Sequence, residues 1–317
     1  MYSVTGYGKM IADGVRVNAY VAALRAAIKP GSVVVELGTG PGLFALVACQ
    51  LGARRVFAIE PDNIIQVGRD AARDQGVADR IEFIQDLSTK VTLPEQANVI
   101  VSDLHGILPW FRQHIPSIID ARSRFLAPGG ILIPSLERLW IAAVEAPAKY
   151  AEVVQPWEDS ALSSGRRFAV NSLSKIRARP EDLLGQPVCW HEIDYGQVEE
   201  VDVCHNISLV VARSGTAHGL AVWFDAELFG GTGFSNAPGE TEMVYGNTFL
   251  AFEQPVEVEA EDRIDVRLEA RLIGEDYAWR WDTTVTSRGQ AKCNFRQSTL
   301  FGAPLSISKL HAQSESV

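Results

Sequence analysis

Hydrophobic positions between about residue 30 and residue 134 fall into short apolar runs that alternate with longer helical stretches. The runs SVVVEL (32–37), RVFAIE (55–60) and NVIVSD (98–103) are each followed by a longer segment that contains apolar residues at helical spacing. Short strands that alternate with helices are typical of βαβ units. The pattern therefore predicts an α/β domain with a parallel sheet and right-handed crossovers.

The pattern changes after residue 135. Short β-rich runs, among them LWIAAV (139–144), GLAVWFDAEL (219–228) and YAWRWDTTV (277–285), are separated by Gly, Pro, Asn and Asp. Such runs predict an antiparallel sandwich or barrel. Residues 150–185 show weaker periodicity, and we expect them to form a helical or irregular insertion.

Composition narrows the class of protein. The chain has 317 residues, 47% of them hydrophobic, which suits two globular domains, and its formal net charge is −10. An acidic chain lacks the basic surface that nucleic acids require. The four cysteines show no paired spacing, the N-terminus does not resemble a signal peptide, and no stretch approaches 18 apolar residues. We expect a cytoplasmic protein with no nucleic-acid or membrane partner.

A glycine-rich turn follows the first strand of the predicted sheet. In VVVELGTGPGLF, Glu36 precedes Gly38, Gly40 and Gly42, and a helix comes next. Glycines at such a turn let backbone amides approach a ligand at a helix N-terminus. A dinucleotide fingerprint would need its third glycine at the position of Leu43. The spacing E-x-G-x-G-x-G instead resembles motif I of class I S-adenosylmethionine-dependent methyltransferases, and nicotinamide binding is the weaker alternative.

Acids at the next two strand ends suit the same ligand. Glu60 ends RVFAIE, where its carboxylate can accept both hydroxyls of a ribose. Asp86 follows the third strand and can accept from an adenine amino group, while the amide of Leu87 donates to the ring. Three strand ends that each suit a part of one nucleoside are a more specific signal for this ligand than any one strand end alone.

The N-terminal segment narrows the resemblance. Met10, Asp13 and Arg16 are spaced three apart, which predicts one face of a helix. This stretch resembles the M-L-x-D-x-x-R helix of protein arginine methyltransferases. The resemblance implies that Arg16 pairs with the methionyl carboxylate of the cofactor and that Met10 packs near the sulfonium.

The same resemblance implies a domain organisation. Residues 1–29 would form cofactor-capping helices, 30–134 a Rossmann-like S-adenosylmethionine-binding domain, and 135–317 an antiparallel β-barrel substrate domain. Residues 155–172 occupy the place of the dimerisation arm of that family, so a homodimer is expected.

Two loops depart from the family pattern. Arginine methyltransferases hold the substrate guanidinium with two glutamates after the fourth strand; here Asp103 and Arg112 stand at those positions. A guanidinium in place of a carboxylate would repel a substrate arginine. The Thr-His-Trp loop of the family is replaced by Met243, Val244 and Tyr245, so the partner of Asp13 would be Val244.

These departures lead to three functional hypotheses. The first is a methyltransferase for a non-arginine acceptor, a small metabolite or modified peptide with an anionic group. In it, Arg112 would grip the anion, Asp103 would orient the nucleophile, His105 would act as base, and Trp110 and Tyr245 would line an aromatic wall. The second is an arginine N-methyltransferase with a rebuilt guanidinium clamp, and the third a catalytically silent scaffold. No histidine shows metal-ligand spacing, so no metal is expected.

Overall fold

The computed structural model describes residues 3–104 and 106–302, and these residues form two compact units. The first unit contains the described residues up to Leu139, together with His191–Val201 and Trp223–Gly246. The second unit contains Trp140–Trp190, Asp202–Val222 and the described residues from Asn247 onward. Two short segments from the later half of the sequence therefore belong to the first unit.

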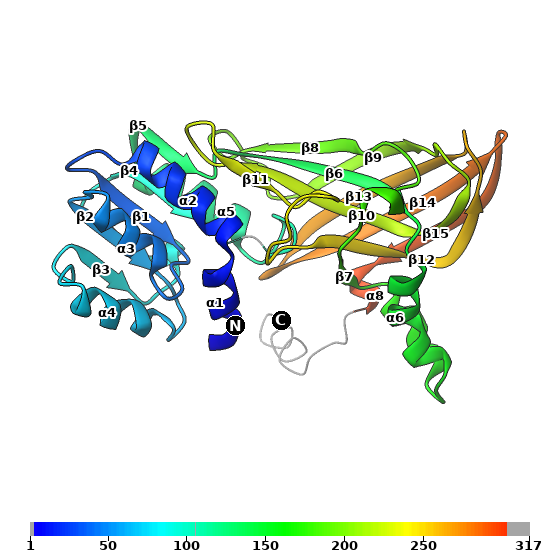
Figure 1. Ribbon diagram of the computed structural model, residues 1–317, viewed down its shortest axis with the longest axis horizontal. Coiled ribbons are helices and arrows are strands. Elements are labelled where there is room, and N and C mark those ends of the chain that lie inside the picture. The colour runs from blue at the N-terminus through cyan, green and yellow to red at the C-terminus, as the bar shows by residue number, and fades with distance from the viewer. Residues whose placement is uncertain (1–2, 105, 303–317) are drawn as a thin grey trace, which may run out of the picture. The chain divides into compact units, whose positions relative to one another are not determined.

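The first unit is built on a parallel sheet (Figure 1). Its strands have the order β3-β2-β1-β4-β5. Their bounds are β1 Val33–Leu37, β2 Arg55–Ile59, β3 Ile81–Ile84, β4 Ala97–Ser102 and β5 Leu126–Ile133. The chain order reverses between β1 and β4, and open parallel sheets bind ligands in the crevice at such a switch point. The parallel α/β domain predicted from the apolar pattern is confirmed.

Four helices of ten residues or so connect and flank these strands. They are α2 Gly14–Ala27, α3 Leu43–Gln50, α4 Ile65–Asp74 and α5 His114–Phe125. Each buries apolar residues; in α3, for example, Phe44, Ala45 and Leu46 are buried. Burial of this apolar stripe supplies most of the stability of a short helix, because isolated helices of this length are marginal in water.

The N-terminal segment is not the single helix that its spacing predicted. Helix α1 (Val4–Ala12) ends before Asp13, and α2 begins at Gly14. The Asp13 carboxylate accepts a hydrogen bond from the backbone N–H of Arg16 at 3.3 Å and so caps α2. Met10 and Arg16 therefore lie on different helices, and the expectation of one shared helix face was wrong.

The two ends of the segment Trp223–Gly246 are joined to each other through an amide side chain of the segment itself. Strand β11 (Gly233–Ser235) pairs with the end of β10 (Gly215–Glu227). Next to β11, buried Asn236 accepts from the backbone N–H of Phe224 at 2.9 Å and donates to the carbonyl of Gly246 at 2.8 Å. These two bonds fix both ends of the segment that carries Met243, Val244 and Tyr245.

The second half of the chain forms antiparallel sheets, as predicted. One sheet has the order β7-β12-β10-β6-β8, with β11 paired to β10, and the other has the order β15-β14-β13-β9. The strands not yet introduced are β6 Leu136–Val144, β7 Leu173–Ile176, β8 Val188–Asp194, β9 Val203–Val210, β12 Asn247–Val258, β13 Arg263–Ile273, β14 Asp276–Ser287 and β15 Gln290–Ser298. Buried and accessible residues alternate along β14, where Trp279 and Trp281 are core side chains.

The stretch expected to be helical or irregular is mainly helical. Helix α6 (Pro147–Glu158) is followed by a 3₁₀ turn, η2 (Ser163–Gly165), and by α7 (Arg166–Ala169). The same stretch also supplies β7, which pairs with β12 at the edge of the sheet, so part of it was missed as a strand. Short elements complete the described chain: η1 Ser88–Lys90, η3 Pro180–Asp182 and α8 Thr299–Gly302. Across residues 3–104 and 106–302, no helix is long and apolar enough to cross a membrane.

Candidate active site

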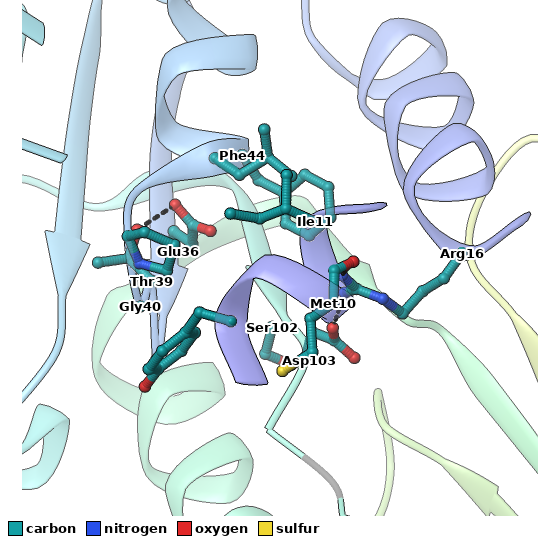
Figure 2. A pocket seen from close by; sticks show the side chains of 13 residues that line it. Met10, Ile11, Arg16, Glu36, Thr39, Gly40, Phe44, Ser102 and Asp103 are labelled. Atoms are coloured by element: carbon teal, nitrogen blue, oxygen red, sulfur yellow. Dashed lines mark hydrogen bonds and ion pairs between the residues drawn. The ribbon is translucent and has the colours of Figure 1, made fainter. Parts of the chain in front are cut away.

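A pocket opens at the carboxyl ends of β1 and β4, where the strand order of the parallel sheet reverses (Figure 2). Helix α1 contributes Tyr7, Met10 and Ile11 to its wall. The other lining residues are Arg16, Glu36, Gly38, Thr39, Gly40, Pro41, Leu43, Phe44, Ser102 and Asp103. Met10, Arg16, Glu36, Gly38 and Gly40, which were predicted to bind the cofactor, thus share one pocket with Asp103.

The glycine turn at the base of this pocket depends on positive φ angles and close approach. Gly38 has φ 65° and Gly40 has φ 54°. A Cβ on Gly38 would collide with the side chain of Leu104, and one on Gly40 would lie 2.9 Å from the ring of Tyr7. Side chains at these positions would fill the space that the pocket uses.

Gly42 has a different environment. It caps the N-terminus of α3 with φ 85°, and a Cβ there would lie 3.0 Å from the Cα of Gly68 on α4. Gly42 does not line the pocket. Its predicted contact with the cofactor is untested, and its visible role is to let two helices pack closely.

Glu36 lies buried in β1 with its carboxyl group directed at the turn. The hydroxyl of Thr39 donates to it at 2.5 Å (Figure 2). Burial raises the pKa of Glu36 to about 8, although hydrogen bonds from Thr39 and from the backbone of Phe44 and Ala45 act in the opposite direction. At neutral pH the side chain is therefore mainly protonated in the ligand-free protein.

Glu60 connects the end of β2 to the same turn. Its carboxylate accepts from the backbone N–H of Gly40 and from that of Asp62, each at 3.0 Å. Burial raises the pKa of Glu60, while these backbone hydrogen bonds lower it. The structure places this acid beside the glycine turn and outside the lining of the pocket, and its predicted binding of the ribose hydroxyls stays a prediction.

Asp86 and Leu87 lie after β3 and do not line the pocket. Both residues are exposed, and the Asp86 carboxylate accepts the hydrogen bond of the Leu87 amide at 2.7 Å. If these two groups bind an adenine ring as predicted, the Leu87 amide must first exchange this local partner for the ring.

A buried ion pair forms the opposite side of the pocket. Arg16 donates from Nη1 to Oδ2 of Asp103 and from Nη2 to the carbonyl of Met10 at 2.5 Å. Burial acts to lower the pKa of Arg16, and the charge of Asp103 raises it, with a net rise. Nε of Arg16 is buried and has no hydrogen-bond partner in the described structure. A buried donor that lines a pocket in this state is suited to an anionic ligand group.

The other carboxylate oxygen of Asp103 faces two tyrosines. Tyr245 donates to Oδ1 at 2.7 Å, and Tyr20 approaches the same oxygen at 3.4 Å while donating to the carbonyl of Ser102 at 3.0 Å. Burial, followed by the charge of Asp103, raises the pKa values of both tyrosines well above the ordinary value. Both hydroxyls therefore stay protonated donors over the physiological pH range.

Two of the residues predicted to bind the acceptor, Arg112 and Trp110, do not line the pocket. Arg112 is exposed, has φ 47°, and its guanidinium lies 5.1 Å from the ring centroid of Phe111. Trp110 is buried and packs 5.3 Å from the ring of His191, which resembles core packing more than an aromatic wall. His105 lies outside the described residues.

Among the residues that were not predicted from the sequence, Tyr7 and Thr39 line the pocket and Tyr20 lies beside it. Tyr7 covers Gly40, Thr39 donates to Glu36, and Tyr20 contacts Asp103. A signal existed for Tyr20, because it follows Arg16 by four positions on α2 and must share a helix face with it. Metal ligands do not gather here: the described residues contain no group of three or more His, Cys, Asp or Glu side chains that could hold an ion.

Comparisons with known proteins agree with this geometry. Residues 18–139 match the family described as ribosomal protein L11 methyltransferase (PrmA), and residues 137–277 match the arginine methyltransferase oligomerization subdomain. Protein arginine N-methyltransferase 6 of Xenopus tropicalis is 29% identical over 283 residues, which cover 82% of either chain. Protein arginine N-methyltransferase PRMT10 of Oryza sativa subsp. japonica is 29% identical over 301 residues, covering 81% of this chain and 78% of the relative.

Solved structures show the same fold. Arabidopsis thaliana protein arginine methyltransferase 10, in an open conformation, has a TM-score of 0.82 at 20% identity and covers 93% of this chain and 97% of its own. A chain of the Trypanosoma brucei PRMT1 enzyme-prozyme complex with AdoHcy has a TM-score of 0.82 at 18% identity, covering 92% and 96%. The present chain is an S-adenosylmethionine-dependent methyltransferase with a Rossmann-like domain followed by an antiparallel β domain. Within that class it resembles the protein arginine methyltransferases.

The residues of the pocket fit S-adenosylmethionine. The unsatisfied Nε of Arg16 can donate to the carboxylate of the amino-acid part, and the backbone of Gly38 and Gly40 leaves room for close approach. Glu60 can accept from ribose hydroxyls in addition to its backbone donors, because a carboxylate has about four acceptor positions. When bound, this cofactor supplies a methyl group on a sulfonium.

We expect that Gly40→Ala weakens S-adenosylhomocysteine binding at least tenfold in calorimetry, because the new Cβ meets Tyr7 and narrows the pocket. Gly31→Ala is the matched control: Gly31 has φ 88°, so the backbone strain is similar, but nothing lies within 4 Å of its Cβ position. Equal affinities of wild type and Gly40→Ala would contradict the placement of the cofactor.

Glu36 should make the stability of the ligand-free protein depend on pH. Its folded pKa of about 8 exceeds the ordinary value of 4.5, so the folded state retains a proton that the unfolded state releases. Between these values its contribution to the unfolding free energy falls by about 1.4 kcal/mol per pH unit as pH rises. Glu36→Gln should lack this slope in urea unfolding from about pH 5.5 to 7.5.

Glu82→Gln, an exposed change on β3, controls for general charge effects. Parallel pH dependences of wild type and Glu36→Gln would show that Glu36 is ionised in the folded protein and would refute this assignment.

Proposed function

We propose that the protein transfers the methyl group to a nitrogen of an arginine side chain in a protein or peptide. The observation that carries the proposal is the position of Asp103: it follows β4 directly, lines the cofactor pocket and belongs to the stretch that resembles the first acid of the guanidinium clamp. The named relatives, which are arginine N-methyltransferases, support the same acceptor.

The chain's own residues would act by positioning. A carboxylate that is held by Arg16 and Tyr245 keeps one geometry, and a fixed acid can orient the attacking nitrogen toward the methyl group. Transfer forms a bond from nitrogen to the methyl carbon, breaks the bond from sulfur to that carbon, and leaves S-adenosylhomocysteine. The nitrogen also loses a proton, for which His105 remains the proposed base.

A second candidate is supported by Arg112. At the position where the family has its second glutamate, this chain carries an exposed guanidinium in a left-handed backbone conformation. A cation at that place opposes a guanidinium acceptor and favours one with a carboxylate or phosphate. The second proposal is therefore a methyltransferase for a non-arginine acceptor with an anionic group.

One substitution separates the two proposals. Arg112→Glu restores an acid, and on the arginine proposal it should raise kcat/KM for an arginine-rich peptide by about tenfold, because it removes repulsion and adds attraction. On the anionic-acceptor proposal, Arg112→Ala and Arg112→Glu should both reduce turnover of acidic metabolites or peptides. The measurement is production of S-adenosylhomocysteine, with free arginine included in the acceptor panel.

Arg73→Glu makes the same charge change on exposed α4 and serves as the control. If the wild type methylates other acceptors but no arginine peptide, the first proposal is refuted. If Arg112→Ala leaves the turnover of acidic acceptors unchanged, the second is refuted. If S-adenosylhomocysteine binds but no acceptor is methylated, the chain behaves as a scaffold.

We also propose that two copies associate through residues 155–172, in line with the match to an oligomerization subdomain. In this segment Trp157, Leu162 and Phe168 are large apolar side chains with exposed fractions of 36%, 65% and 40%. Burial of such side chains favours association, because it removes apolar surface from water.

Wild type should have the mass of a dimer in light scattering, and Leu162→Glu should shift it toward a monomer because a carboxylate would be buried. Val210→Glu, at an exposed apolar position of β9, should leave the mass unchanged. A monomeric wild type at micromolar concentration would refute this interface.

A further inference from the structure

We propose that Tyr245 is a positioning residue for Asp103. In this chain its hydroxyl holds in place the acid that binds the acceptor. The phenol oxygen lies 2.7 Å from Oδ1 of Asp103, across 142 positions of sequence. This assignment rests on the proposed role of Asp103 at the acceptor. It changes the role expected for Tyr245 from a wall that touches the acceptor to a group that acts through another residue.

The position of Tyr245 is determined by its neighbour. The backbone N–H of Val244 donates to Oδ2 of Asp13 at 2.7 Å, within the same unit. Asp13 also caps α2 through its other oxygen, so one carboxylate holds both the start of α2 and the loop that carries Tyr245. The backbone N–H of residue 244 thus makes a hydrogen bond to Asp13 that its side chain, a valine, cannot make.

The ring of Tyr245 is enclosed by aromatic neighbours. It stacks on Phe234 with centroids 6.2 Å apart and planes 6° apart, and it meets Phe224 edge-on at 5.6 Å. The Tyr245 side chain is buried, with an exposed fraction of 7%. This packing restricts the ring to one direction, and its hydroxyl is aimed at the carboxylate.

Two donors consequently hold Asp103 from two directions, and the Tyr20 hydroxyl, whose proton goes to the Ser102 carbonyl, lies beside them. Arg16 approaches Oδ2, whereas Tyr245 and Tyr20 approach Oδ1. A cofactor carboxylate that binds the guanidinium of Arg16 would weaken the bond from Arg16 to Oδ2 of Asp103. The bond from Tyr245 to Oδ1 would stay intact. Tyr245 would therefore keep Asp103 in place in the state in which the acceptor binds. Burial holds the pKa of Tyr245 above its ordinary range, so this donor persists at every working pH.

The test compares Tyr245→Phe with wild type. The variant keeps the ring and its packing and removes one charge-assisted hydrogen bond. We expect kcat/KM for the methylated acceptor to fall roughly 10- to 100-fold, chiefly through KM of the acceptor. Affinity for S-adenosylhomocysteine should change by less than about threefold, since Arg16 and the glycine turn are retained. Rates are expressed per S-adenosylhomocysteine-binding site, so a partly unfolded variant does not imitate the effect.

Tyr150→Phe is the matched control, because Tyr150 is also a buried tyrosine whose hydroxyl donates to a carbonyl, that of Glu253, at 3.0 Å in the second unit. It should lower thermal stability without altering the acceptor KM. Unchanged kcat/KM in Tyr245→Phe would overturn the assignment.

A second readout does not depend on turnover. In crystals grown with S-adenosylhomocysteine, the Asp103 carboxylate should leave its wild-type position or occupy two rotamers in Tyr245→Phe. If wild type methylates no acceptor, the proposed function fails, yet the displacement of Asp103 still supports the positioning role. An unmoved Asp103 in the variant crystal would overturn that role even if the enzyme proves active.

Discussion

The buried ion pair between Arg16 and Asp103 joins helix α2 to the end of β4 in the wall of the pocket. Arg16 belongs to the first turn of α2, and Asp103 is the first residue after β4, so the pair fixes the start of a helix against the carboxyl end of an inner strand of the parallel sheet. Removing one partner of such a pair costs about 3–5 kcal/mol, because the other charge is left buried without compensation. The pair therefore constrains both the fold and any chemistry in the pocket.

A second acid extends this constraint to distant parts of the chain. Asp13 separates α1 from α2, caps α2 and accepts from the loop amide of Val244. Because the cap orients the first turn of α2, it also determines where the Arg16 side chain leaves the helix. Two carboxylates, Asp13 and Asp103, thus connect the N-terminal helices, the end of β4 and the loop at Tyr245 within one unit.

The cofactor side of the pocket could be predicted from sequence because its signals are local. The positions of Glu36, Gly38 and Gly40 follow from a strand, a turn and a helix that are adjacent in the chain, and Glu60 follows from the end of the next strand. The break at Asp13 was missed for a physical reason. Spacing by three fits one helix equally well, and only the competition between continuing the helix and capping a new one decides the outcome.

The surroundings of Asp103 resisted prediction because their contacts join residues that are far apart in sequence. Nothing near Tyr245 indicates that its hydroxyl reaches Asp103, and nothing near Val244 indicates that its amide faces Asp13. Residue type was also a poor guide to contact: Arg112 and Trp110 were chosen for their chemistry, yet one is exposed beside Phe111 and the other is buried beside His191. This loop lacks the side chains of the family motif. Its main chain still donates to Asp13, through the N–H of Val244, and the hydroxyl of the next residue, Tyr245, donates to Asp103. What such a site can bind then depends on the charges around Asp103, and the structure places the guanidinium of Arg16 among them.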